Sequence, residues 1–432
     1  MDPSKLVPPK ALVLLVGALG LISLTVIYGR RLNYPPIRSD GMGYYLYLPA
    51  SIIDRDLTLQ TTIARSFGGT SPEWAGVNRI RETDRLLIKY PPGEAIMLAP
   101  FFILAHGLTL VSGIAPADGF SVLYQAAAAI GGLCYVLLGL DVLRRLLEKS
   151  FSPSVVWWTL VVMVFGTNLF HYATYDSIFS HAFSFCLFAL FLYGVERWYA
   201  GPSAGRTIAL AFVAGLITLV RPTNSVIFVF ALLFDADING REGVRERLSL
   251  LRRNARLLLA GALVYVGMLS PLFAYWKYIT GHWIIFSYTG EAFAFSHPQI
   301  LNVLFSVRKG LFFWSPVLLF ATAGFFVMRK YKRAYVLPTL VFMPLNLYII
   351  ASWRNWAYGG SFGHRAFVES IAIFAVGYAS LIESRPDRAP ARATIIITSC
   401  LLVLLSTRLM LEYWLGVIPF DGTTWQRFTS AL

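Results

Sequence analysis

The sequence predicts an all-α polytopic membrane protein with about eleven transmembrane helices, and two features favour this fold class. The 432-residue chain is 56% hydrophobic and only 14% charged, whereas about a quarter of the residues in a soluble domain are charged. Apolar stretches near the ~20 residues that cross a bilayer as a helix recur along almost the whole length. A soluble protein of this size could not bury them all.

The first apolar stretch, residues 11–28, is expected to be a retained transmembrane helix with its N-terminus in the cytoplasm. It follows Lys5 and Lys10 but leads into Gly29-Arg30-Arg31 without a small-residue cleavage site. We expect a single membrane domain with a first outer loop over residues 29–118, a helical bundle over 119–412 and an outer tail over 413–432. The later candidate spans are residues 120–143, 154–170, 177–195, 206–221, 223–236, 257–277, 311–328, 334–351, 366–383 and 393–412.

Residues 93–113 are apolar enough to cross, but their crossing would place the basic segments 144–149 and 241–256 outside. Cytoplasmic loops normally carry the excess of Lys and Arg. If the segment instead enters from the outer face and returns, every later basic cluster becomes cytoplasmic. Pro100 and His106 suit such a re-entrant or interfacial helix. The chain would then have its C-terminus outside.

The net charge of +14 does not indicate nucleic-acid binding. Basic residues lie mainly in short segments between apolar stretches, as topology determinants do. The three cysteines, Cys134, Cys186 and Cys400, each lie within an apolar stretch. They are therefore interpreted as packing residues, neither a disulfide nor a metal-binding set.

Asp40 lies just after the first helix, in the segment Ser39-Asp40-Gly41-Met42-Gly43-Tyr44-Tyr45. The glycines would let the backbone turn sharply as it leaves the bilayer. A partly desolvated carboxylate there would have a raised pKa and accept a proton. The alternative is that Asp40 caps an interfacial helix.

Asp176, in Tyr175-Asp176-Ser177, is expected at the same depth on the same face. Helix capping would again explain an Asp followed by Ser. His171 and His181 flank it, and His181 is either a packing residue or part of a site.

Several basic residues are expected on the outer face, against the usual bias. For any single one, anchoring by snorkelling is the simpler explanation. Together they suit an anionic lipid headgroup, because Arg binds phosphate through two hydrogen bonds. Gly359, Gly360 and Gly363 would let backbone N–H groups approach such a ligand. The residues are Lys89, Arg221, Arg354, His364 and Arg365.

This arrangement resembles the GT-C superfamily of membrane glycosyltransferases, and most closely its protein O-mannosyltransferase and aminoarabinose-transferase branch. Asp40 matches the acidic residue of the first outer loop, with Gly41 where a second acid often stands. Tyr90-Pro91-Pro92 resembles the motif that opens a non-spanning helix, with Tyr in the basic position and Lys89 one place earlier. The stretch from Trp356 to Arg365 resembles a Gly-Gly-x-Phe-Gly-x-Arg element of bacterial relatives.

The resemblance implies inverting transfer of a sugar from a polyprenyl-phosphate donor to a lipid, glycan or protein acceptor. Asp40 would be the general base, and Asp176 would position the acceptor or the base. Lys89, Arg365 and Arg221 would hold the phosphate leaving group, with Tyr90, His181, Arg354 and His364 as further binding residues. No cofactor or metal is implied, and the partners are the lipid donor, the acceptor and membrane lipids.

Two alternatives from other classes remain open at this point. A transporter or flippase of a lipid-linked glycan would share the helix count and the cationic outer site. It should, however, show inverted repeats or charged residues near the bilayer midplane, and the sequence has few of them. A non-catalytic assembly protein is the third possibility. Whatever the function, the compact loops suggest a bacterial inner membrane, with the site on the periplasmic face.

Overall fold

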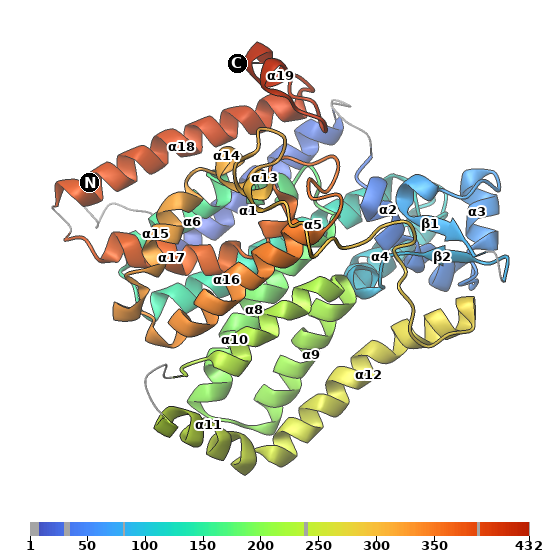
Figure 1. The fold of residues 1–432 in the computed structure, drawn as a ribbon. Helices are drawn as coiled ribbons and strands as arrows, with labels where there is room; N and C mark the ends of the chain where they lie inside the picture. Colours follow the sequence, from blue (N-terminus) through green and yellow to red (C-terminus); the bar gives the residue numbers. More distant parts are fainter. Residues whose placement is uncertain (1–7, 30–34, 81–82, 237–240, 387–388, 432) are drawn as a thin grey trace.

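Helices form most of the computed structural model (Figure 1), which describes residues 8–29, 35–80, 83–236, 241–386 and 389–431. Six described helices are long and apolar enough to cross a membrane. The predicted total of about eleven spans is not confirmed by this count. The six are α1 (Pro9–Gly29), α4 (Gly93–Ser112), α5 (Val122–Glu148), α12 (Ala255–Thr280), α16 (Arg333–Ser352) and α18 (Pro390–Trp414).

Other helices pack among and beside these six. The central one is α8 (Ser180–Ala200), which packs against α5, α9 and α17. The other helices are α6 (Pro153–Phe165), α7 (Leu169–Ala173), α9 (Ala204–Val220), α10 (Phe228–Leu233), α11 (Arg241–Arg253), α13 (Ile300–Phe305), α14 (Leu311–Trp314), α15 (Leu318–Phe325), α17 (Ile371–Glu383) and α19 (Trp425–Ala431). Turns of 3-10 helix lie at Pro222–Ile227, Met328–Lys330 and Arg365–Phe367.

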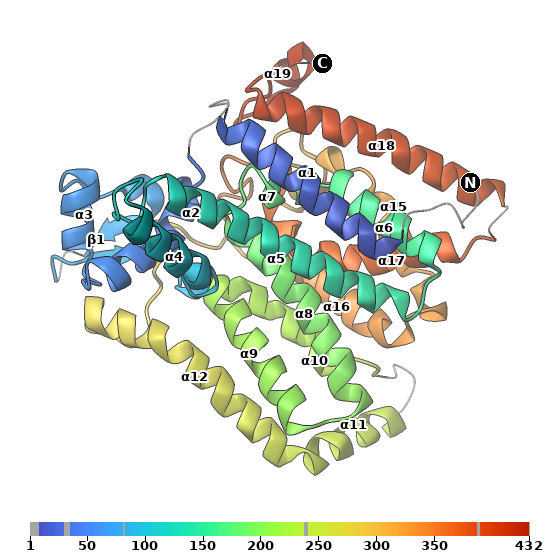
Figure 2. The ribbon, with the colours of Figure 1, turned by 180° about the vertical axis from the view of Figure 1, so that it is seen from behind.

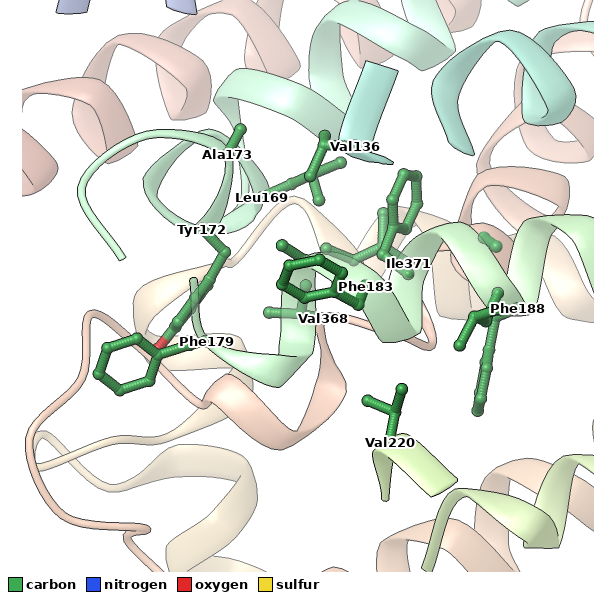
Figure 3. Close-up of a cluster of buried hydrophobic side chains, with 14 of the residues drawn as sticks. Val136, Leu169, Tyr172, Ala173, Phe179, Phe183, Phe188, Val220, Val368 and Ile371 are labelled. Atoms are coloured by element: carbon green, nitrogen blue, oxygen red, sulfur yellow. The ribbon is translucent and has the colours of Figure 1, made fainter. Parts of the chain in front are cut away.

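The buried core lies around α8. Figure 3 shows Phe183 of α8 near Val136 of α5 and Ile371 of α17, and all three side chains are buried. Gly139 of α5 lets the two helices approach closely, because a Cβ there would lie 2.9 Å from the Cα of Cys186. Small residues at helix interfaces allow such close packing in membranes. Seen from behind in Figure 2, α1 lies beside α5 and α6.

Basic residues meet at one end of the bundle. The Nζ atoms of Lys149 and Lys332 lie 2.7 and 2.6 Å from the two carboxylate oxygens of Glu196. These contacts join the ends of α5 and α8 to the start of α16, so we call this the basic end. At the opposite end lie α2 (Ser39–Tyr45), α3 (Gln60–Phe67) and a small hairpin, seen together on the right of Figure 1.

The segments that precede and follow α4 meet at that opposite end. The chain before it contacts the chain after it, because the Tyr45 hydroxyl donates to the Gly119 carbonyl at 2.7 Å and Arg65 to that of Asp118 at 2.7 Å. Along its length α4 packs on the first half of α5, where the Tyr135 hydroxyl donates to the Met97 carbonyl at 2.7 Å. The length and composition of α4 would also allow a crossing, so its re-entrant path stays a prediction.

Within the described residues, the only strands lie in the segment predicted to form the first outer loop. Strand β1 (Val77–Arg79) pairs antiparallel with β2 (Leu86–Ile88), with Val77 opposite Ile88. The loop also holds a π-helical turn at Pro49–Ile53 and a 3-10 turn at Glu73–Ala75. This hairpin departs from the all-α prediction. Its consequence is that Lys89 and Tyr90 follow directly on a buried strand.

Candidate active site

A cavity of about 900 Å³ opens at the end of the bundle where α2 lies, within the size range of small-molecule sites. Its wall comes from α2, the end of β2, the breaks after α7 and α9, residues 285–293, the segment 353–365 and residues 413–420. Four basic and three acidic side chains line it together with many aromatic rings. The charged residues are Arg38, Lys89, Arg221 and Arg365 with Asp40, Asp176 and Glu291.

Asp40 lies in the first turn of α2 and makes no capping hydrogen bond, so the capping alternative is wrong. The Arg365 Nη2 atom lies 2.9 Å from its Oδ2 atom, and the Tyr90 side chain helps to lower its pKa. Burial raises the pKa of Asp40, but the charges of Arg365 and Lys89 outweigh it and hold the pKa below its ordinary value of 3.8. The expected raised pKa is therefore wrong, and the Asp40 carboxylate is ionised at neutral pH.

The glycines beside Asp40 serve close packing. Gly41 and Gly43 both lie within helix α2, so the expected sharp turn is wrong. A Cβ at Gly43 would lie 2.6 Å from the ring of Tyr90 and overlap the carbonyl oxygen of Ala75. Because these glycines lack side chains, α2 and its Asp40 can pack against Tyr90 and the 3-10 turn at Glu73–Ala75.

Lys89 reaches the cavity past Gly76, where φ is +72° and a Cβ would lie 2.8 Å from the lysine side chain. Its Nζ atom lies 2.7 Å from Glu291 Oε1 and 5.1 and 5.2 Å from the ring centres of Tyr90 and Tyr288. Such rings attract a cation through their electron-rich faces. The ring of Tyr90 also stacks on that of Tyr44, with centroids 4.3 Å apart. Lys89 is thus held at the wall by an acid and two rings.

The side chain of Asp176 is 6% exposed, and both of its carboxylate oxygens have partners. Its Oδ1 atom lies 2.6 Å from Arg38 Nη2 and its Oδ2 atom 2.9 Å from His171 Nε2. The indole N–H of Trp414 donates to His171 Nδ1 at 2.9 Å, so the proton of a neutral His171 lies on Nε2 and points to Asp176. Burial raises the pKa of Asp176, but Arg38 and His171 lower it to about 2. It caps no helix, since α8 begins at Ser180 after an N-cap at Phe179.

Arg221 lies where α9 ends. The residue before a proline avoids the helical region, and Arg221 is extended, with φ −149° and ψ 108°, before Pro222. Its Nη1 atom lies 2.9 Å from His181 Nε2 and its Nε atom 3.8 Å from Glu369 Oε1. Arg221 lines the cavity, whereas His181 is buried behind the wall and does not.

Two other predicted residues also lie off the wall. Arg354 is exposed, and neither it nor His364 lines the cavity. Burial lowers the pKa of His364 to about 3, and its Nε2 atom lies 3.1 Å from the carbonyl oxygen of Trp356. A neutral, buried imidazole is poorly suited to bind phosphate. Gly359 and Gly360 line the cavity, whereas Gly363 packs against Trp314.

Three charged residues of the site were not singled out by sequence analysis. Arg38 and Glu291 lie on the cavity wall, and their loops were expected on the outer face. Glu369 lies behind it, within the predicted span 366–383. An acid in an apolar stretch is a signal of function, and it could have identified Glu369. In the parts of the chain that the structure describes, no three His, Cys, Asp or Glu side chains gather into a metal site.

The comparisons with known proteins place the fold. No family model matches the sequence, and no curated protein matches it. The apo oligosaccharyltransferase of Archaeoglobus fulgidus is similar in structure, with a TM-score of 0.52 and 11% identity over 98% of this chain and 57% of that one. The oligosaccharyltransferase AglB of the same organism, in complex with an inhibitory peptide and a dolichol-phosphate, gives 0.51 and 11% with the same coverage.

The chain therefore spans 57% of the length of the oligosaccharyltransferases it resembles. AglB has the GT-C fold, so the comparisons support a GT-C-like fold for this chain, while the branch expected from the sequence is not confirmed. At 11% identity the likeness concerns the fold alone. What the chain does must follow from its own cavity.

Proposed function

We propose that the chain is a glycosyltransferase that moves a sugar from a polyprenyl-phosphate donor to an acceptor at the outer face of the membrane, with inversion. The observation that carries this proposal is the ionised Asp40 beside Arg365 and Lys89, at the wall of a large cavity in a GT-C fold. A dolichol-phosphate bound to AglB supports a lipid-phosphate donor.

In the proposed reaction the acceptor hydroxyl or amine gives its proton to Asp40 as its oxygen or nitrogen bonds to C1 of the sugar. The bond between C1 and the phosphate oxygen breaks, and the electron pair leaves with the phosphate. Lys89, Arg221 and Arg365 lie around the cavity where that charge would develop. Basic groups fixed in advance stabilise such a transition state without reorganisation.

The donor phosphate also changes the proposed base. It competes with Asp40 for Arg365 and Lys89, the two cations that lower the pKa of Asp40. As they turn to the phosphate, the pKa of Asp40 rises, and a base with a higher pKa takes a proton more readily. Donor binding would thus activate the base.

Asp176 has a different role in this proposal. Its carboxylate is held by Arg38 and His171, so it fixes Arg38 at the wall and does not itself remove a proton. His181, Arg354 and His364 make no direct contact with the donor in this proposal, because they do not line the cavity.

For the cellular setting we propose a bacterial inner membrane, with the N-terminus in the cytoplasm, about eleven spans and the cavity facing the periplasm. The bias of Lys and Arg toward the cytoplasm supports this orientation. The end joined by Lys149, Glu196 and Lys332 would then be cytoplasmic.

The test is transfer of radiolabelled sugar from a panel of polyprenyl-phosphate sugars by the purified chain in nanodiscs, with Asp40→Asn alongside. The matched control is Asp54→Asn, since Asp54 lies in the same loop and pairs with Arg65 at 2.8 Å but does not line the cavity. We expect transfer by the wild type and the control, and none by Asp40→Asn. Equal transfer by all three would remove Asp40 from the mechanism.

A further inference from the structure

Arg221 differs from the other basic residues of the cavity in where its acidic partner lies. Arg38, Lys89 and Arg365 each pair with an acid that also lines the wall. The acid nearest Arg221 is Glu369, which is 2% exposed and does not line the cavity. An anion entering the cavity can therefore approach Arg221 without displacing a carboxylate.

The group behind Arg221 is a chain of hydrogen bonds. Glu369 Oε2 lies 3.2 Å from His181 Nδ1, and His181 Nε2 lies 2.9 Å from Arg221 Nη1. Arginine only donates hydrogen bonds and carboxylate only accepts them. A neutral His181 therefore carries its proton on Nδ1, toward Glu369, and Arg221 Nη1 lies against the ring, 2.9 Å from Nε2 and 3.3 Å from Nδ1. A neutral histidine joins a buried acid to an arginine at the cavity.

The local chain conformation builds this arrangement. Pro222 ends α9 and begins a 3-10 turn, in which the Asn224 N–H donates to the Arg221 carbonyl at 2.9 Å. This turn brings the Asn224 amide behind the wall, where its Nδ2 atom lies 3.3 Å from Glu369 Oε1. One turn of the chain thus supplies both Arg221 at the cavity and Asn224, which contacts the Glu369 carboxylate behind it.

We propose that Arg221 is the resting anion-binding group of the cavity, which takes the donor phosphate first, and that Glu369 and His181 are its positioning residues. Lys89 and Arg365 join only after leaving Glu291 and Asp40. This inference rests on the proposed lipid-phosphate donor. It assigns His181 a supporting role in place of the direct phosphate contact expected from the sequence.

A held arginine binds an anion with less loss of side-chain freedom. Fixing a free arginine side chain costs rotamer entropy, and in Arg221 the folded chain has already met much of that cost. Releasing it from His181 would restore its freedom and weaken phosphate binding while its charge stays the same. A loss of phosphate binding at unchanged charge would therefore show that His181 acts by positioning Arg221 and not by electrostatic attraction alone.

The test measures binding of farnesyl phosphate to the full chain in nanodiscs, with farnesol as the uncharged probe. In His181→Phe, the ring shape that packs 5.3 Å from Tyr172 is kept and the contact to Arg221 is lost. We expect the Kd for farnesyl phosphate to rise at least about tenfold, as for loss of a charge-assisted hydrogen bond. Farnesol binding should not change. The matched control is His106→Phe, because His106 bonds to Tyr124 on α5, outside the cavity wall.

A second variant, Arg221→Lys, keeps the charge and the fold but loses the planar group that His181 holds. It should also weaken farnesyl phosphate binding about tenfold. Combined with His181→Phe it should lose no more, since both changes remove one interaction. Additive losses, or an unchanged Kd in Arg221→Lys, would overturn the inference.

The outcome is separable from that of the proposed function. Tight, phosphate-dependent binding without sugar transfer would retain Arg221 as the anion-binding group and reject the enzyme. Equal affinity of the wild type for farnesol and farnesyl phosphate would overturn the inference even if transfer occurs.

Discussion

Asp176→Asn is the change that best separates support from catalysis in this cavity. In the wild type, the carboxylate lies 2.6 Å from Arg38 and 2.9 Å from His171 and is almost fully buried. Asparagine has nearly the same shape but no charge. Arg38 would lose its counter-ion, while the packing of Tyr175 on Trp414 next to it stays in place.

The size of the effect follows from the pKa. The pKa of Asp176 falls from its ordinary 3.8 to about 2, and each pKa unit corresponds to about 1.4 kcal/mol. A lowered folded-state pKa adds stability above the ordinary value, and this stability is lost as the pH falls from about 4 through about 2. At pH 7 the contribution is fully present. Asp176→Asn should therefore lower the free energy of unfolding by about 2 kcal/mol.

Unfolding by sodium dodecyl sulfate in mixed micelles would measure this loss, and transfer per folded molecule would be measured alongside. We expect transfer by Asp176→Asn to stay within about tenfold of the wild type, against a loss of at least about 100-fold in Asp40→Asn, as for removal of a general base. An Asp176→Asn chain of wild-type stability with a 100-fold lower rate would refute the reasoning. Asp176 would then be a proton acceptor.

Other predictions concern the charges around Asp40. Because Arg365 and Lys89 hold the pKa of Asp40 low, kcat/KM should fall only below about pH 4, as the pH drops through that pKa. Donor binding draws both cations away from Asp40, so kcat should begin to fall at a higher pH than kcat/KM does. If kcat and kcat/KM fell at the same pH, this prediction would be wrong. Glu291→Gln removes the carboxylate that holds Lys89 at 2.7 Å. Because the Glu291 side chain is 35% exposed, the gain should be small, and farnesyl phosphate should bind up to about fivefold more tightly. Weaker binding of farnesyl phosphate to this variant would contradict the prediction. Arg365→Gln should lower kcat at least about 100-fold, whereas Arg354→Gln, at an exposed residue, should lower it less than about twofold. If both variants lowered the transfer rate equally, the assigned cavity wall would be wrong.

The sequence predicted which segments meet better than it predicted how they interact. The positive-inside bias sorted the loops to two faces, and six of the predicted site residues accordingly line one cavity: Asp40, Lys89, Tyr90, Asp176, Arg221 and Arg365. Such a grouping follows because a bilayer allows a loop only two sides, while the orientation of the chain in a membrane stays a prediction. The prediction needed no knowledge of side-chain contacts.

The same reasoning could not predict the pKa of Asp40. Its direction depends on whether burial or two cations prevail, and those cations come from positions 89 and 365, far along the chain. The capping alternatives failed for a related reason. Each predicted helix start was off by a few residues, and α8 begins four residues after Asp176. Sequence alone gives such boundaries only roughly.

The charges at the wall also explain how the base and the leaving group would act together. A polyprenyl-phosphate sugar carries one negative charge, and the phosphate that leaves gains a second one. Asp40 becomes neutral as it takes the acceptor proton, and its claim on Arg365 at 2.9 Å then ends. The bound donor has already drawn Arg365 toward the phosphate, and protonation of Asp40 ends the remaining attraction in the step that increases the phosphate charge. Proton transfer and departure of the phosphate would thus favour each other through one arginine, which explains why the proposed base is paired with a cation although the pairing lowers its pKa.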